Sequence, residues 1–170
     1  MAELSEESVF FLRVTPGRVE HALEELRRHP HVKEAEAVMG TYDVAVTGAF
    51  RSSEELRKFQ AELEAKDFCE GCAAHPGFEN WRREEAEEEP VNGWTLIRAV
   101  DVDRAMKDLQ RVPSVQRIIG TTGEYNLIAR IGAKDPNALQ ETVIRDIQKI
   151  HGIRRTETRP SLTRPSLKTM

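Results

Sequence analysis

Gly40-Thr41-Tyr42-Asp43 is the stretch that decides the fold, and it recurs 83 positions later as Gly123-Glu124-Tyr125-Asn126. Each copy follows a short apolar run and precedes a segment in which apolar and polar residues alternate, the pattern of a β-strand. Glycine suits the turn of a hairpin because it adopts backbone conformations that other residues avoid. The sequence therefore predicts a duplication, with one hairpin turn in each copy.

The two copies keep one register over most of their length. At the same offset, nine residues of the first copy recur unchanged in the second. They are Val19, Ala22, Leu26, Arg28, Pro30, Val32, Gly40, Tyr42 and Leu56, matching Val102, Ala105, Leu109, Arg111, Pro113, Val115, Gly123, Tyr125 and Leu139. Internal repetition of this kind indicates two structural units of the same architecture.

Each copy is expected to have the element order β-α-β-β-α-β. In the first copy, strands are expected over 9–14, 32–38, 42–47 and 68–75, and helices over 19–29 and 53–63. The helices follow from apolar residues at helical spacing, from Pro30, and from Ser52 and Glu55 at capping-box spacing. In the second copy, strands are expected over 94–100, 115–122, 125–131 and 152–159, with helices that begin at Asp101 and at Asp135-Pro136.

Composition narrows the class of protein. The chain has 170 residues, a net charge of −4 and two cysteines. It has no sustained basic stripe for nucleic acid, no apolar run that would span a bilayer, and an acidic N-terminus unlike a signal peptide. We therefore expect a cytoplasmic protein with no disulfide framework, no membrane partner and no direct contact with nucleic acid.

The boundaries of the repeats follow from these patterns. A first repeat is expected over 8–76 and a second over 94–160. Between them, 77–93 contains a run of glutamates and arginines and is expected to be an acidic linker or a short surface helix. Residues 161–170 are expected to form a flexible tail.

Five pieces of the chain form a pattern of order and spacing across the two copies. In the first copy the pieces are His29-Pro30-His31-Val32 and Met39-Gly40-Thr41-Tyr42-Asp43. In the second they are Pro113-Ser114-Val115, Thr122-Gly123-Glu124-Tyr125-Asn126 and Gly152-Ile153-Arg154-Arg155-Thr156-Glu157-Thr158. In their order and spacing, these pieces resemble the ligand-binding (RAM) domain of the Lrp/AsnC regulators, in two tandem copies.

The resemblance implies an α+β fold of two ferredoxin-like repeats, packed sheet to sheet as an intramolecular pseudo-dimer of the dimeric α+β barrel type. It also implies amino-acid sensing near the Gly-x-Tyr-Asp turn, a role in transcription regulation, and assembly into oligomers. Family members usually carry a helix-turn-helix domain before this one. Here the first strand begins within about ten residues of Met1, so the usual DNA-reading domain is not expected.

The first turn offers a partner to each charged group of an amino acid. Backbone N–H groups beside Gly40 can meet a carboxylate, and Asp43 can pair with an ammonium. Thr41 adds a hydroxyl and Tyr42 a ring wall. The alternative is a local structural role, in which glycine forms the turn, tyrosine packs on the sheet and aspartate accepts nearby backbone N–H groups.

The second turn is expected to differ, because Asn126 is neutral and cannot balance an ammonium. Glu124 is a substitute charge, and Thr156 and Thr158 are expected to line this site, where the first copy has Cys72 and Ala74. The candidate ligand-binding residues are Gly40, Thr41, Tyr42, Asp43, Gly123, Glu124, Tyr125, Asn126, Thr156 and Thr158.

Other patterns carry less chemistry. Cys69, Cys72 and His75 are three potential metal ligands, but a tetrahedral site needs a fourth and a plain strand is the alternative. No catalytic residues and no cofactor are predicted.

Three functions remain open. The first is a stand-alone regulatory module that binds an amino acid or related metabolite and acts by self-association or through a family regulator. The second is a small enzyme or a cofactor- or haem-binding protein that uses the cavity between the two sheets. The third is an oligomerisation module without a ligand.

Overall fold

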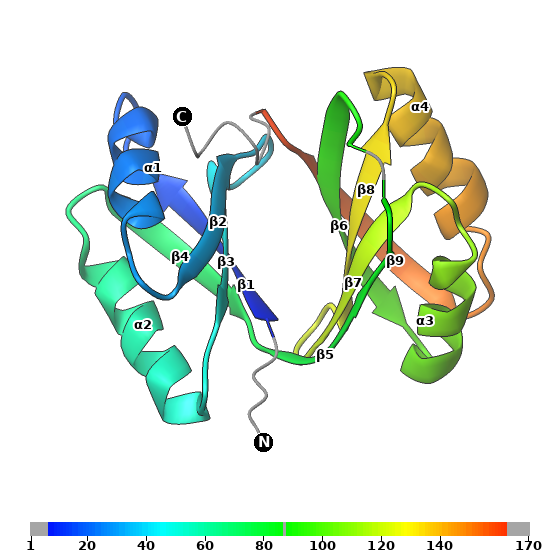
Figure 1. Cartoon of the computed structure of the whole chain (residues 1–170), viewed down its shortest axis with the longest axis horizontal. Helices are drawn as coiled ribbons and strands as arrows, with labels where there is room; N and C mark the ends of the chain where they lie inside the picture. Colours follow the sequence, from blue (N-terminus) through cyan, green and yellow to red (C-terminus); the bar gives the residue numbers. More distant parts are fainter. Residues whose placement is uncertain (1–6, 87, 163–170) are drawn as a thin grey trace. The chain divides into compact units, whose positions relative to one another are not determined.

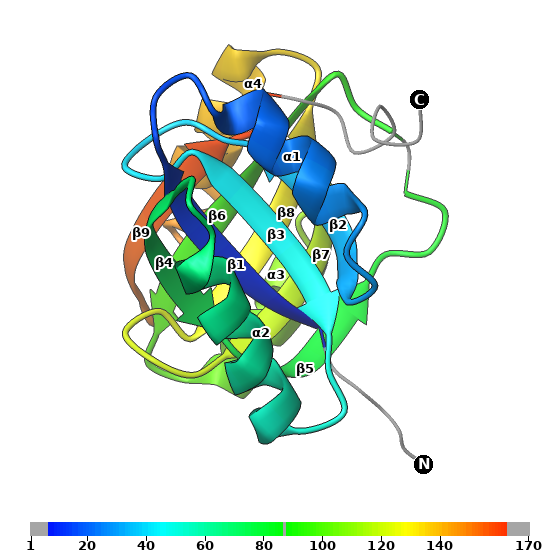
Figure 2. The ribbon, with the colours of Figure 1, turned by 90° about the vertical axis from the view of Figure 1, so that its left-hand side faces the viewer.

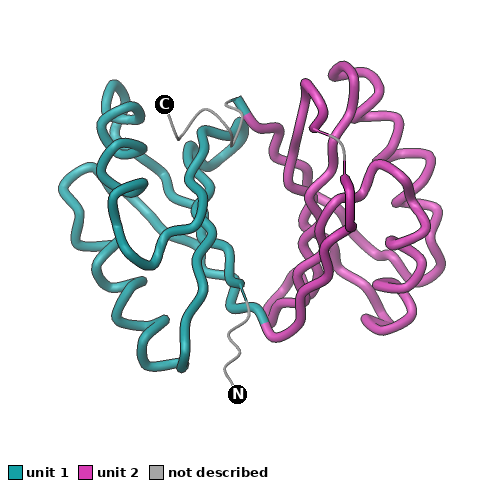
Figure 3. Tube along the Cα trace, viewed as in Figure 1, with its two compact units in different colours: residues 1–77, 162–170 teal, residues 78–161 magenta. Residues whose placement is uncertain are grey.

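The computed structural model describes residues 7–86 and 88–162. They fall into two compact units (Figure 3). Unit 1 comprises 7–77 together with Leu162, and unit 2 comprises the described residues of 78–161. The predicted first repeat lies within unit 1 and the predicted second repeat within unit 2. The predicted flexible tail lies outside the described residues from 163 onward.

Unit 1 has the expected order of elements (Figure 1). They are β1 (Glu7–Val14), α1 (Val19–Arg27), β2 (Val32–Ala37), β3 (Val44–Ala49), α2 (Ser53–Ala65) and β4 (Cys69–His75). The strands form one antiparallel sheet in the order β2-β3-β1-β4. Both helices cover the same face of this sheet (Figure 2).

The core of unit 1 lies between its sheet and its helices. Phe10 and Leu12 of β1 contribute fully buried side chains, and Leu26 and Phe59 meet them from α1 and α2. The rings of Phe10 and Phe59 pack edge to face with centroids 5.2 Å apart. As the spacing predicts, Ser52 caps α2, because its hydroxyl accepts the N–H of Glu55 at 3.1 Å.

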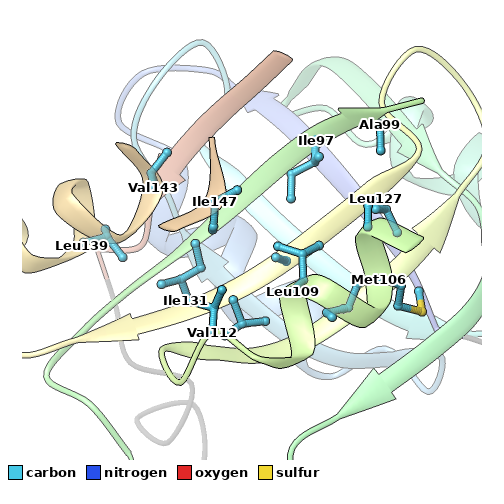
Figure 4. Packing of buried hydrophobic residues seen from close by; sticks show 14 of the residues in the cluster. Ile97, Ala99, Met106, Leu109, Val112, Leu127, Ile131, Leu139, Val143 and Ile147 are labelled. Atoms are coloured by element: carbon cyan, nitrogen blue, oxygen red, sulfur yellow. The ribbon is translucent and has the colours of Figure 1, made fainter. Parts of the chain in front are cut away.

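Unit 2 repeats this plan and adds one strand. Its elements are β5 (Gly77–Arg82), β6 (Val91–Ala99), α3 (Val102–Gln110), β7 (Val115–Thr121), β8 (Leu127–Ala133), α4 (Pro136–Glu141), η1 (Thr142–Ile147) and β9 (Ile153–Pro160). The sheet order is β5-β7-β8-β6-β9. Figure 4 shows the core, in which Ile97 and Leu127 of the sheet pack with Leu109 and Ile147 of the helical segments.

The last helical segment differs from a simple α-helix. The sequence predicts one helix from Asp135, and the chain instead changes from α4 to the π-helical η1 at Thr142. Leu139, Val143 and Ile147 recur every four residues, more slowly than the α-helical period of about 3.6. The wider π turns keep all three buried against the sheet.

The segment predicted as a linker contains ordered sheet. Residues 77–82 form β5 at the edge of the unit 2 sheet, and β6 already begins at Val91. This strand forms because its aromatic side chains bury apolar area, a signal that the neighbouring charge run obscures in the sequence. Trp81 packs against the core of unit 2 and the ring of Phe78 lies against Gly120. Arg83 then stacks over Trp81, with its Cζ 4.9 Å from the ring centroid, and donates to the carbonyl of Val115.

Within the described ranges, no helix is long and apolar enough to cross a membrane.

Candidate functional site

Both Gly-x-Tyr turns have the same backbone conformation. Gly40 has a φ of 118° and Gly123 a φ of 119°, in the region that favours glycine. A Cβ at Gly123 would meet nothing within 4 Å, so the backbone angle, rather than space, requires glycine. The residue three positions later pairs with the first strand in each copy: Asp43 N–H donates to Leu12 at 2.8 Å and Asn126 N–H to Ile97 at 2.9 Å.

The first turn has a carboxylate and an aromatic ring on neighbouring residues, and a guanidinium from β1 lies near the ring. The Asp43 carboxylate accepts the backbone N–H of Val14 at 2.8 Å, so part of its role is local. The guanidinium of Arg13 lies over the Tyr42 ring, with its Cζ 5.9 Å from the centroid. A carboxylate has about four acceptor positions, so one backbone bond leaves Asp43 able to accept further hydrogen bonds.

Gly71 is the reason that Arg13 can lie there. Arg13 is the register partner of Gly71 on β4, and a Cβ at Gly71 would come within 2.6 Å of the guanidinium. The corresponding pair in unit 2 is Arg98 and Arg155. Sequence reasoning did not select Arg13 or Gly71 for this site. The sequence signal that could have identified them is that Arg13 and Arg98 are equivalent, whereas Gly71 has an arginine, Arg155, as its counterpart in the second copy.

The second turn uses its polar groups within its own repeat. The Asn126 side chain accepts the N–H of Ala99 and donates to the carbonyl of Ala99, both at 2.9 Å. Arg98 donates to the carbonyl of Glu124 at 2.8 Å, and the Glu124 carboxylate lies 3.5 Å from Arg155. Asn126 therefore has a structural role that an aspartate would fill only in part.

Tyr125 belongs to a hydrogen-bonded chain that the sequence did not predict. Its hydroxyl donates to Glu157 at 3.2 Å, and Glu157 pairs with the buried Arg159 at 2.8 Å. Burial raises the pKa of Tyr125, and the Glu157 carboxylate raises this pKa further. The phenol is thus held neutral, as a hydrogen-bond donor.

Thr156 and Thr158 lie on the other face of β9 from Glu157. The hydroxyl of Thr156 accepts from Gln148 at 2.7 Å, and that of Thr158 lies 3.0 Å from the hydroxyl of Thr95. Since side chains alternate along a strand, these two hydroxyls point away from the carboxylate that Tyr125 reaches. The structure does not bring the two threonines together with the Tyr125 hydroxyl.

The suggested metal ligands on β4 do not converge. Cys72 is paired with Leu12 and packs against the helix-covered core, whereas His75 is paired with Val9 and contacts Phe11 on the opposite face. Burial raises the pKa of Cys72 to about 12, which disfavours the thiolate that metals bind. Among the residues that the structure describes, no group of three or more His, Cys, Asp or Glu side chains is placed to hold a metal ion.

Comparison with solved structures defines the class of fold. The siroheme decarboxylase NirDL matches over 94% of this chain and 72% of its own, with a TM-score of 0.70 and 10% identity. Chlorite dismutase from Candidatus Nitrospira defluvii matches over 95% and 92%, with a TM-score of 0.58 and 10% identity. At these identities the likeness concerns the fold alone. The protein is an α+β protein of two tandem ferredoxin-like repeats, of the dimeric α+β barrel type, as predicted.

The family follows from the sequence. The model of the Lrp/AsnC ligand binding domain matches residues 8–75 and again residues 96–169. The chain therefore belongs to the Lrp/AsnC ligand-binding domain family, in two copies. AsnC of E. coli is 28% identical over 44% of this chain and 52% of its own, with a TM-score of 0.41. A search of curated proteins finds no match.

Proposed function

We propose that the protein is a regulatory module that binds an amino acid or a related small metabolite at the first turn. Membership of a ligand-binding family supports a small-molecule effector. The observation that carries the proposal is the arrangement of Arg13, Tyr42 and Asp43: the ring and the carboxylate belong to the turn, and the Arg13 guanidinium reaches the ring from β1. The groups suit a zwitterion: guanidinium or turn N–H groups for its carboxylate, and Asp43 for its ammonium.

The two turns are not equivalent in this proposal. In the second turn, the carboxylate of Glu124 is already paired with Arg155 and the amide of Asn126 already binds Ala99. Ligand binding there would have to displace these contacts. We therefore assign the effector to the first turn and a structural role to the second.

The effector would act on assembly. We propose that the module responds by self-association or by binding a regulator of its own family. Light scattering with and without the amino acid tests this step, and an unchanged mass would leave a partner regulator as the route.

A thermal-shift screen against the proteinogenic amino acids tests the proposal. An amino acid that binds the folded chain raises its Tm, and Asp43→Asn should reduce the shift while keeping an acceptor for Val14 N–H. Asp67→Asn is the matched control, because Asp67 is an exposed aspartate of the same unit that pairs with Arg18 at 3.5 Å. A shift as large in Asp43→Asn as in the parent would refute the assignment to this turn.

A second candidate function rests on unit 2. Arg117 of β7 and Arg130 of β8 lie near Trp94 of β6, with their Cζ atoms 5.4 and 4.8 Å from its ring centroid, and all three residues are buried. Two guanidinium groups beside a large ring suit a planar cofactor with carboxylate groups. Titration with haemin, followed by its Soret band, tests this candidate: a saturable spectral change that weakens in Arg130→Gln would favour it over amino-acid sensing.

A further inference from the structure

Unit 2 contains a pocket whose lining includes none of the residues of either turn. It has a volume of about 400 Å³ and lies where β6 ends, α3 begins and the chain enters β9. Its lining includes Val100, Asp101 and Arg104 from the end of β6 and the start of α3, and Gly152, Ile153 and Arg154 from the start of β9. A volume of this size falls within the range of small-molecule sites, roughly 300–1,000 Å³.

The pocket is open because of a glycine that the first repeat lacks. Val100 N–H donates to the carbonyl of Gly152 at 2.8 Å, and Thr15 N–H donates to the carbonyl of Phe68 at 2.9 Å in the same place in unit 1. Phe68 is fully buried and its ring centroid lies 5.9 Å from that of His21, the residue that corresponds to Arg104. An aromatic side chain thus occupies this place in unit 1, where unit 2 leaves space.

The charges also differ between the two copies. β1 pairs Val14 with Cys69, and β6 pairs Ala99 with Ile153, so the next residues, Glu70 and Arg154, correspond. The first repeat therefore has an acid at the position of a base in the second. Arg104, whose guanidinium lies 4.0 Å from the Asp108 carboxylate, also lines the pocket, and His151 is a further lining residue.

Asp101 decides which kind of ligand suits the pocket. Its carboxylate accepts the N–H of Arg104 at 3.1 Å and so caps α3, and it is exposed within the pocket lining. A simple anion drawn to the two arginines would also meet this negative charge. A ligand with both a carboxylate and an ammonium would satisfy both signs, and Val100 and Ile153 offer apolar contact for an aliphatic side chain.

We propose that this pocket is a second amino-acid site, which takes a zwitterionic ligand with a small or medium aliphatic side chain. The carboxylate binds Arg104 and Arg154, and the ammonium binds Asp101. The inference rests on the proposed function, because it places a second molecule of the same class of effector on the chain. It also explains why the polar groups of the second turn are engaged in hydrogen bonds and an ion pair within unit 2: each repeat has one site, at a different place.

Calorimetric titration of the full chain with aliphatic amino acids tests the inference. The parent should bind two amino-acid molecules per chain. Asp43→Asn should bind one, at the pocket, and Asp101→Asn should bind one, at the first turn. Asparagine is as good an N-cap as aspartate, so Asp101→Asn removes the charge without removing the cap. Arg154→Glu, which copies Glu70 at an exposed position, should weaken binding at the pocket by roughly tenfold or more, the loss expected for a charge-assisted hydrogen bond.

The outcomes separate this inference from the proposed function. If Asp101→Asn and Arg154→Glu bind like the parent while Asp43→Asn binds nothing, the pocket is not a site and the proposed function stands. If no amino acid binds the parent, both fail. If the corresponding carboxylic acids without an amino group, or inorganic phosphate, bind as well as the amino acids, the pocket is a plain anion site and the zwitterion assignment is wrong.

Discussion

Exchange of the fourth turn residue, Asp43 or Asn126, between the two copies separates structural from functional roles. Asn126 makes two hydrogen bonds to Ala99, one accepted and one donated. Asn126→Asp keeps the first, loses the second and leaves the Ala99 carbonyl beside a carboxylate. Because Ala99 is only 4% exposed, its carbonyl would lose a partner in a place with little water, at a cost of about 1–3 kcal/mol.

Asp43→Asn should have the opposite effect on stability. The variant keeps an acceptor for Val14 N–H and gains an NH₂ group that can donate to the Val14 carbonyl, as Asn126 does to Ala99. One added hydrogen bond contributes about 0.5–1.5 kcal/mol. If stability were the reason for the aspartate at position 43, this substitution would be costly. The structure therefore predicts a variant that is at least as stable as the parent and has lost its ligand.

Urea unfolding measures both effects. Both tryptophans of the chain, Trp81 and Trp94, lie in unit 2, so their fluorescence reports the unfolding of the unit that contains Asn126. Circular dichroism follows the unfolding of the Asp43→Asn variant, because both tryptophans lie outside unit 1. For a chain of this size, the cost of Asn126→Asp corresponds to a decrease in Tm of roughly 2–12 °C. A decrease in Asp43→Asn as large as in Asn126→Asp would refute the reasoning, because it would make Asp43 a structural residue.

Three further substitutions test separate parts of the account. Gly71→Ala should displace the Arg13 side chain and weaken the amino-acid response without a large change in Tm, since the side chain that must move is flexible; a normal response would exclude Arg13 from the site. Cys72→Ala should reduce the loss of stability as pH rises from about 9 to 12, because the raised pKa of this thiol stabilises the fold below that range; an unchanged alkaline profile would contradict the burial of this thiol. Gly123→Ala should destabilise unit 2 by about 1 kcal/mol or more through its φ of 119°, measured by tryptophan fluorescence in urea; no loss would argue against this backbone conformation.

The sequence predicted those elements whose signals are local and periodic. Helix α1 follows its apolar spacing, Asp101 and Asp135 cap their helices as expected, and the two glycines mark the two turns. These features depend on neighbours within a few residues, so a single amino-acid sequence is enough to identify them.

The features that were missed depend on contacts between distant residues. Strand β5 was predicted to be part of a linker because its two aromatic residues stand next to a charge run. Its strand conformation depends on pairing with β7, which lies far away in the sequence. The bond from Tyr125 to Glu157 spans 32 positions. The pocket of unit 2 depends on Gly152 standing where the first repeat has Phe68, which becomes visible only when the backbone contacts align the two copies.

The most direct test of the central claim is the Kd of the full chain for the amino acid that gives the largest thermal shift. Titrations compare the parent with Asp43→Asn and with the control Asp67→Asn. The account predicts that the control matches the parent, and that Asp43→Asn loses roughly tenfold or more of its affinity at one of the sites while remaining as stable as the parent. Equal affinity in Asp43→Asn, or no binding of any amino acid to the parent, would contradict it.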